Sequence, residues 1–227
     1  MNLTPLQGPL DFWDRFAPWY EKWLSRGTYH FEILQEVGRM IEPGWRVLDI
    51  GAGTGALAIP LASLDCPVRA LEPSAGMRDF LSAKLFSFGI ENVKVLSQRW
   101  EDFQMNGEEG TDLLIACNSL HLTAGGIAGG MRKAFSSGAA HIALITEINQ
   151  GVPIDFKEID ALQNDYDFLF IKNHHVDSSF HFESMEEVEE LQHFLNREIR
   201  VLQEDGRPVQ RDSTDIAIVW WERRRGG

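Results

Sequence analysis

The stretch RVLDIGAGTGALAIPLA, residues 46–62, decides the fold of this 227-residue chain. A short, mostly apolar run, residues 47–50, is followed at once by Gly51, Gly53 and Gly55. A second apolar pattern comes after these glycines. A short buried strand that turns into a helix through glycines is typical of a strand–turn–helix unit whose backbone approaches a ligand closely. The stretch therefore predicts a ligand site at the end of the first strand.

Beyond this unit, apolar runs alternate with helical patterns. We expect strands at 46–50, 67–72, 93–97, 112–117 and 140–147, and helices at 55–64, 74–88 and within 123–137. Strands this short and apolar are typically buried on both faces, which predicts an α/β fold with a doubly wound, mostly parallel sheet and helices on both sides. Pro60 removes a backbone donor from the first of these helices, so we expect that helix to be short or kinked.

The flanking segments have a different character. The aromatic segment 11–42 contains Pro18 and Gly27, which predicts short helices before a longer one at 30–41. Aromatics and histidines without periodicity fill 150–183, and Ser184 with Glu187 forms a capping box that starts a helix. Two strands, 198–203 and 215–221, are expected to pair antiparallel at the end. We thus divide a single domain into an N-terminal helical lid (1–42), a cofactor-binding core (43–149), a cap insertion with its helix (150–197) and terminal strands (198–227).

Composition narrows the class of partner. Thirty-four acidic residues against 21 basic ones give a formal charge of −13, which predicts no nucleic-acid and no membrane partner. Arg223, Arg224 and Arg225 are interpreted as a solvated end. No signal segment or 18-residue apolar run is found, so we expect a soluble, cytoplasmic protein. Cys66 and Cys117 are too few for a disulfide framework and are expected to be free thiols; the sequence predicts no oligomeric state.

The glycine turn is compatible with two ligand classes. Gly51, Gly53 and Ala56 fit the dinucleotide pattern G-x-G-x-x-G/A, but Asp49 also fits an acidic-x-G-x-G-x-G pattern. A pyrophosphate would be opposed by Asp49, whereas the ammonium and sulfonium of S-adenosylmethionine would be favoured by it. Glu72, 21 residues after Gly51 (72 − 51), suits the ribose hydroxyls of either ligand. S-adenosyl-L-methionine is the favoured cofactor, and an NAD-dependent oxidoreductase is the alternative.

Four motifs support the first ligand. The segments VLDIGAGTG (47–55), ALEPSAGM (70–77), QRWEDF (98–103) and DLLIACNSLHL (112–122) resemble, in order and spacing, the successive motifs of the class I S-adenosylmethionine-dependent methyltransferases. The resemblance implies a Rossmann-like, seven-stranded sheet with six parallel strands and the last antiparallel. It also implies a methyltransferase.

The same resemblance implies a set of cofactor-binding residues: Tyr20, Asp49, Gly51, Ala52, Gly53, Gly55, Glu72, Pro73, Met77, Trp100, Glu101 and Asn118. By this resemblance, the glycine turn passes under the methionine part of the cofactor, Glu72 holds its ribose, and Pro73 and Met77 lie near its adenine. Trp100 is expected to stack on the adenine. Arg99 stands where the family often has an acid that bonds the adenine amino group.

Methyl transfer is an in-line displacement that mainly requires positioning and the exclusion of water. Asn118, Ser119 and His121 follow a strand and should face the transferred methyl group. His121 is the candidate catalytic base for an acceptor that must lose a proton. A passive role for His121 is the alternative.

The other reactive side chains are interpreted structurally. Cys117 is expected to be a buried structural thiol. His174, His175 and His181 match no zinc spacing, so no metal is expected. With nearby aromatics they are interpreted as a cap over a small-molecule methyl acceptor; the cap aromatics are Phe156, Tyr166, Phe168, Phe170, Phe180 and Phe182. A regulatory subunit that binds S-adenosylmethionine or S-adenosylhomocysteine without turnover is a further alternative.

Overall fold

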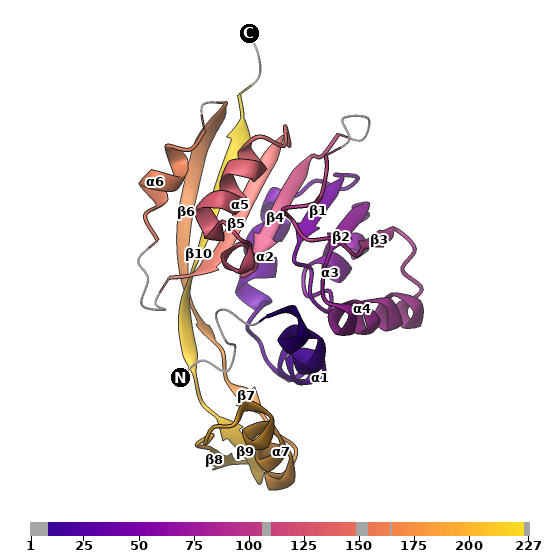
Figure 1. The fold of residues 1–227 in the computed structure, drawn as a ribbon, viewed down its shortest axis with the longest axis vertical. Coiled ribbons are helices and arrows are strands. Elements are labelled where there is room, and N and C mark those ends of the chain that lie inside the picture. The colour runs from indigo at the N-terminus through magenta and orange to yellow at the C-terminus, as the bar shows by residue number, and fades with distance from the viewer. Residues whose placement is uncertain (1–8, 106–109, 149–153, 164, 225–227) are drawn as a thin grey trace.

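A seven-stranded sheet forms the centre of the computed structural model, which describes residues 9–105, 110–148, 154–163 and 165–224 (Figure 1). The strand order is β3-β2-β1-β4-β5-β10-β6. Its strands are β1 (Val47–Ile50), β2 (Val68–Leu71), β3 (Val93–Leu96), β4 (Leu113–Cys117), β5 (His141–Glu147), β6 (Tyr166–Asp177) and β10 (Ser213–Arg223). β10 runs antiparallel to both β5 and β6, and the other pairs are parallel. The predicted doubly wound sheet with its last strand antiparallel is confirmed.

Helices cover both faces of this sheet. On one face, α2 (Phe31–Met40), α3 (Ala58–Ser63) and α4 (Ala75–Phe88) pack over alternate strand residues such as Val47 and Ile115. On the other face, α5 (Gly126–Phe135) and α6 (Phe156–Asp160) pack over Leu48, Ile50 and Leu114. β1 is buried along its whole length because consecutive side chains enter different cores.

The helix that contains Pro60 is short, as predicted, and begins only at Ala58. Within the described residues, no helix combines the length and the apolar character needed to cross a membrane.

The first helix differs from its prediction. α1 (Leu10–Arg26) is continuous through Pro18, where short helices were expected. Pro18 cannot donate to the carbonyl of Asp14, one turn earlier. That carbonyl lies against α4, so close that a Cβ on Gly76 would be 2.3 Å from it. The Asp14 carboxylate also accepts from Ser74 Oγ at 2.7 Å. Tertiary contact with α4 thus holds α1 together across its proline.

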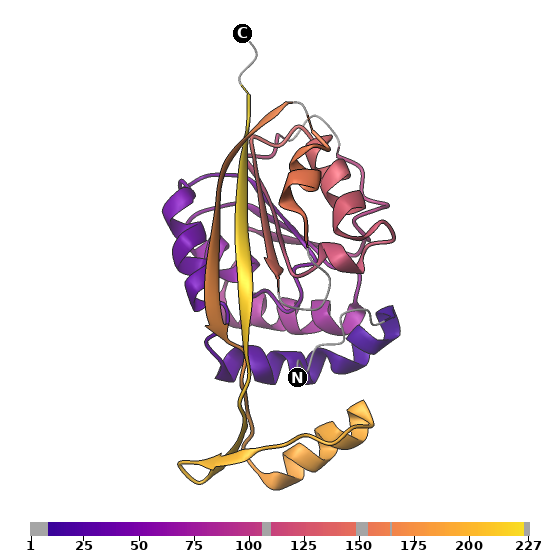
Figure 2. The same cartoon turned by 90° about the vertical axis from the view of Figure 1, so that its left-hand side faces the viewer.

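Residues 178–212 form a small unit appended to the sheet, hereafter the appended unit. It contains β7 (Phe180–His181), α7 (Met185–Leu195), β8 (Leu202–Glu204) and β9 (Arg207–Gln210), with the three strands ordered β7-β9-β8. As predicted, Ser184 caps α7 by accepting from the amide of Glu187. Figure 2 shows the unit beyond α1, joined to the main sheet by the extended ends of β6 and β10.

The predicted pairing of the two terminal strands is wrong. β8 pairs with β9, not with β10. The reason is local: Asp205 and Gly206 both have positive φ, 49° and 78°, and form a two-residue hairpin turn directly after β8. β10 instead enters the main sheet between β5 and β6.

The expected cap over 150–183 is corrected in part. Twelve of its residues, Tyr166–Asp177, form the edge strand β6. Its exposed residues Phe168, Leu169 and Ile171 hide the usual alternation of apolar and polar side chains, so periodicity gave no strand signal. Phe180 and Phe182 instead pack in an aromatic cluster with Phe12, Phe16 and Trp19 of α1 and Phe194 of α7.

The arginine-rich end of the chain is engaged where the structure describes it. Arg224 pairs with Asp167 at 2.8 Å, and Arg223 donates to the carbonyl of Gly138. Arg225 lies outside the described residues.

Candidate active site

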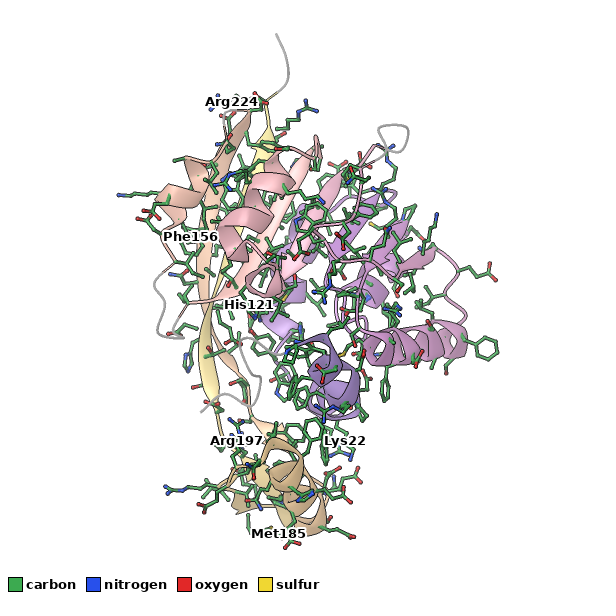
Figure 3. All side chains as sticks on the ribbon, in the orientation of Figure 1. Lys22, His121, Phe156, Met185, Arg197 and Arg224 are labelled. Atoms are coloured by element: carbon green, nitrogen blue, oxygen red, sulfur yellow. The ribbon has the colours of Figure 1, made fainter. Side chains whose placement is uncertain are left out.

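A cavity of about 790 Å³ opens at the carboxyl ends of β1, β2, β4 and β5. One wall comes from α1 through Leu10, Trp13, Tyr20 and Trp23. The opposite wall comes from the start of α5 and from α6 and its flanks. Figure 3 labels His121 between α5 and α1, on this end of the sheet. The volume lies within the range of small-molecule and cofactor sites.

The glycine turn forms the floor of this cavity. Gly51 has φ +69°, and a Cβ there would lie 2.4 Å from Cβ of Ser119. Ser119 is itself held by donation from its hydroxyl to the carbonyl of Ile50 at 2.5 Å. Gly53, with φ +56°, also lines the cavity. The turn therefore requires glycine at Gly51 both for its backbone conformation and for the approach of the chain after β4.

Glu72 is fixed at the end of β2 by two backbone donors. Its carboxylate accepts from the amides of Gly53 and Ser74, both at 2.8 Å. The side chain lines the cavity although the residue is buried. Burial raises the pKa of this carboxyl, and the two amides oppose that shift. Glu72 thus presents a held acceptor beside the glycine turn.

Asp49 lies behind the cavity wall and does not line it. It is 2% exposed, and its Oδ2 has no hydrogen-bond partner among the described residues. Burial raises its pKa to about 7, and the charge of Glu72 adds to the effect. A buried carboxylate oxygen without a partner is costly, and a nearby cationic ligand would relieve that cost.

Tyr20, Pro73 and Met77 all line the cavity, as their predicted roles require. The Tyr20 ring lies over the glycine turn, since a Cβ on Gly53 would be 3.5 Å from its Cε1. Burial raises the pKa of Tyr20 well above its usual value, so its hydroxyl stays neutral. Ala52 and Gly55 do not line the cavity: Ala52 is buried, and a Cβ on Gly55 would meet Leu81 at 2.6 Å. These two residues shape the turn from beneath.

The loop after β3 contributes Arg99, Trp100 and Glu101 to the lining. Trp100 is only 3% exposed; its indole N–H donates to the carbonyl of Gly130 at 3.0 Å, and Lys133 Nζ lies 4.8 Å from the ring centroid. Most of this ring is therefore committed to core packing. Glu101 accepts from the amide of Ala124 at 2.7 Å and so ties this loop to the segment before α5.

His121 lies in a 3₁₀ turn, η1 (Leu120–Leu122), and lines the cavity. Burial lowers its pKa, so the imidazole is neutral at pH 7 and can accept a proton. Asn118, at the end of β4, has φ +47°. Its amide donates to the Tyr29 hydroxyl at 2.6 Å and accepts from the amide of Glu147 at 3.0 Å. The Asn118 side chain is thus engaged with protein groups.

Sequence reasoning missed several polar residues of the lining, among them Tyr29, His30 and Glu147. Glu147 closes β5, and its position at the carboxyl end of a parallel strand could have identified it. Tyr29 and His30 lie in the turn between α1 and α2 and have no such signal. His30 Nδ1 is buried and has no hydrogen-bond partner among the residues that the structure describes, and burial lowers the pKa of His30 to about 4.

The histidine-containing part of the predicted cap does not line this cavity, whereas α6 and its flanks, from the same predicted segment 150–183, do. His174 and His175 lie on β6, His181 lies on β7, and none of them lines the cavity. His175 Nδ1 is 2.7 Å from Asp215. Over the described residues, no three side chains of His, Cys, Asp or Glu are grouped to hold a metal ion. Cys66 and Cys117 are free thiols, and burial raises the pKa of Cys117, which lies in the cavity wall.

Comparison with known proteins places this site in a family context. Residues 47–137 match the model of the family described as "Methyltransferase domain". Over 83 residues the chain is 37% identical to the ribosomal RNA small subunit methyltransferase G of Mycolicibacterium gilvum, covering 35% of this chain and 36% of that protein. An uncharacterized Haemophilus influenzae protein is 32% identical over 103 residues, covering 44% and 36%. The matched parts thus span about a third of the length of these curated relatives.

Solved structures share the fold over most of the chain. A Bacillus halodurans protein provisionally described as a methyltransferase has a TM-score of 0.61 at 14% identity, covering 85% of this chain and 99% of that chain. Magnesium protoporphyrin IX methyltransferase from Synechocystis, solved with bound S-adenosylmethionine, has a TM-score of 0.54 at 15% identity, covering 85% and 77%. At such identities the likeness establishes the architecture.

Proposed function

We propose that this protein transfers the methyl group of S-adenosyl-L-methionine to a small-molecule acceptor, because residues 47–137 match the family described as "Methyltransferase domain" and solved structures described as methyltransferases share the fold. One observation carries the proposal. Beside the glycine turn the cavity lining presents a held carboxylate, Glu72, and behind the wall lies Asp49, whose buried Oδ2 has no hydrogen-bond partner in the described part of the chain. This charge pattern suits a cationic adenosine ligand and opposes a bisphosphate.

The residues present fit that cofactor. The turn Gly51–Gly53 would pass under its methionine part, Glu72 would bind the ribose hydroxyls, and Tyr20 would cover the turn. When bound, the cofactor supplies an electrophilic methyl group on sulfur. The chain's own contribution is to position the acceptor, to exclude water with α1, and at His121 to accept a proton where the acceptor must lose one.

A soluble, cytoplasmic setting belongs to the same proposal. The small acceptor is supported by the position of the cavity, which is walled by α1 and α6 and lined by apolar side chains such as Trp23, Ile127 and Leu162. Such a site encloses a ligand from several sides.

Ribosomal RNA is the second candidate acceptor, because the curated relatives include ribosomal RNA methyltransferases. The formal charge of −13 disfavours it, since RNA binding relies on neutralising phosphates. Incubation of 30S subunits with the protein and labelled cofactor, at low and high salt, tests this candidate. Label in the RNA would replace the small-molecule proposal.

Calorimetric titration separates the proposed cofactor from its rivals. We expect S-adenosylmethionine and S-adenosylhomocysteine to bind and NADH to leave no signal. Tight NADH binding without S-adenosylmethionine binding would make the protein an oxidoreductase. Binding of both sulfur compounds, with no methyl transfer to small molecules or RNA, would favour the regulatory subunit.

A further inference from the structure

The turn between α1 and α2 places an imidazole, that of His30, in the cavity wall. His30 precedes α2 directly, is 8% exposed and lines the cavity. Two aromatic rings hold it edge-on, with centroid distances of 4.9 Å to Tyr29 and 5.9 Å to Trp23. Its Nδ1 is buried and has no hydrogen-bond partner among the described residues. Because buried polar groups are normally hydrogen-bonded, an imidazole left in this state indicates a ligand contact.

The position of the ring proton follows from this burial. Burial lowers the pKa of His30 to about 4, and no charge of a described residue adds to that shift, so the imidazole is neutral at pH 7 and carries one N–H. Unpaired N–H groups are rarer in protein interiors than unpaired acceptors, so the lone pair belongs on the buried Nδ1 and the proton on Nε2. His30 thus offers the cavity an uncharged hydrogen-bond donor.

His30 belongs to the part of the wall that covers the glycine turn. The Trp23 ring, which packs on His30, has its centroid 5.6 Å from that of Tyr20. Tyr20 lies over the turn itself, since a Cβ on Gly53 would be 3.5 Å from its ring. The methionine part of the proposed cofactor would lie over this same turn. His30 therefore stands in the wall beside that part of the ligand.

The methionine part carries an ammonium and a carboxylate, which need opposite surroundings. The ammonium suits the carboxyl side chains of Asp49 and Glu72. The described lining contains two arginines and no lysine. Arg99 follows the edge strand β3, and Arg132 lies on α5, on the face of the sheet opposite α2. A carboxylate beside α2 therefore has no cationic side chain from that wall and depends on uncharged donors.

A second buried nitrogen belongs to a different end of the cavity. Trp13 Nε1 also has no hydrogen-bond partner in the part of the chain that the structure describes. Its neighbour Asp14 accepts from Ser74 Oγ at 2.7 Å, directly before α4. Pro73 and Met77, which flank this contact in the chain, are the residues expected near the adenine. Trp13 thus belongs to the adenosine end, whereas His30 belongs to the amino-acid end.

We propose that His30 binds the carboxylate of the cofactor's methionine part by donating from Nε2, so that this chain holds that group without a positive charge. The inference rests on the proposed function and adds a binding residue to the same site. His30 fixes the amino-acid part, and with it the sulfur, against the glycine turn. A hydrogen bond to a charged acceptor is stronger than one between neutral groups, so the loss of this single donor is measurable.

Three ligands that share adenosine and a thioether test the proposal by calorimetry on the full chain. S-adenosylhomocysteine carries the carboxylate and the amine, its decarboxylated form carries the amine only, and methylthioadenosine carries neither. H30F keeps an aromatic ring and removes the donor. It should weaken S-adenosylhomocysteine binding at least about tenfold and leave the affinities of the other two ligands within about twofold.

Matched variants and one measurement on the natural chain make the result specific. H30Q supplies a neutral N–H donor and should restore part of the S-adenosylhomocysteine affinity. H193F makes the same exchange at an exposed position on α7 and should change none of the three affinities. In the natural chain, the NMR signal of the His30 ring N–H should shift when S-adenosylhomocysteine is added and shift much less with the decarboxylated form.

The outcomes separate the two proposals. Absence of S-adenosylhomocysteine binding to the natural chain would refute the proposed function itself. Normal binding to the natural chain, together with an H30F affinity within about twofold or with an equal loss for all three ligands, would overturn the role of His30 alone. Should H30F lose its helical circular dichroism, the NMR comparison decides, and a ring signal that responds alike to both compounds would overturn that role.

Discussion

The buried carboxylate of Asp49 should make cofactor binding depend on pH. Burial, reinforced by the charge of Glu72, raises the pKa of Asp49 to about 7 in the ligand-free protein. The sulfonium and ammonium of S-adenosylmethionine favour the ionised form. With a pKa near 7, about a tenth of the molecules carry ionised Asp49 at pH 6 and about nine tenths at pH 8. Affinity should therefore rise about tenfold from pH 6 to pH 8, or roughly 1.4 kcal/mol.

Calorimetric titration of S-adenosylmethionine at pH 6, 7 and 8 measures this effect. S-adenosylhomocysteine lacks the sulfonium and should show a smaller rise. D49N keeps the shape of the side chain and removes its charge, so its affinity should be lower at pH 8 and nearly independent of pH.

Stability provides the control. Because folding raises the pKa of Asp49, this carboxyl makes the folded protein less stable as pH rises above the pKa that Asp49 has in the unfolded chain, by up to about 4 kcal/mol. D49N should therefore be at least as stable as the natural chain at pH 8 in urea denaturation, so weaker binding cannot be ascribed to unfolding. Equal affinities at pH 6 and pH 8, or a pH dependence that survives in D49N, would refute the electrostatic reasoning.

Three further predictions concern the elements that shape the site. G76A places a Cβ 2.3 Å from the carbonyl of Asp14, so the free energy of unfolding, measured by thermal denaturation, should fall by about 1–3 kcal/mol, and calorimetry should show a weaker cofactor affinity. G38A, in open space on α2, is the control and should not destabilise the protein. Equal behaviour of the two variants would contradict the packing argument. G51A, whose Cβ would meet Ser119 at 2.4 Å, should abolish cofactor binding while circular dichroism retains the helices, and unchanged affinity would show that the turn tolerates a side chain. Burial opposes the ionised form of Glu187, but hydrogen bonds from Arg26 and Lys22 outweigh it and lower the pKa of Glu187 to about 2. Ionised Glu187 therefore stabilises the fold by about 3 kcal/mol above pH 5, and this stabilisation is lost as pH falls toward 2. The difference in unfolding free energy between the natural chain and E187Q should shrink over that range, and a constant difference would refute the assignment.

Glu187 also connects the appended unit to the cavity. Its partners Lys22 and Arg26 lie on α1, and Figure 3 labels Lys22 on the side of α1 that faces the appended unit. Tyr20 and Trp23 of the same helix line the site. The appended unit therefore supports the cavity wall without contributing to its lining.

Local pattern determined much of this protein. The apolar run 47–50 and the glycines after it specify a strand, a positive-φ turn and a helix start, and these depend on neighbours in the chain. The alternation that follows specifies strands β2 to β5, because strands buried on both faces must be apolar throughout. The same logic brought Gly51, Glu72 and His121 to one edge of the sheet, where the structure places them around the cavity.

Tertiary structure decided the rest. The edge strand β6 follows no local alternation, since its pairing with β10 and not its own periodicity makes it a strand. α1 continues through Pro18 because α4 approaches at Gly76, which contacts Asp14, 62 residues earlier in the chain (76 − 14). Tyr29, Asn118 and Glu147 meet because β4 and β5 are neighbours and α2 begins beside them. Such meetings depend on packing between distant segments, and no short stretch of sequence encodes them.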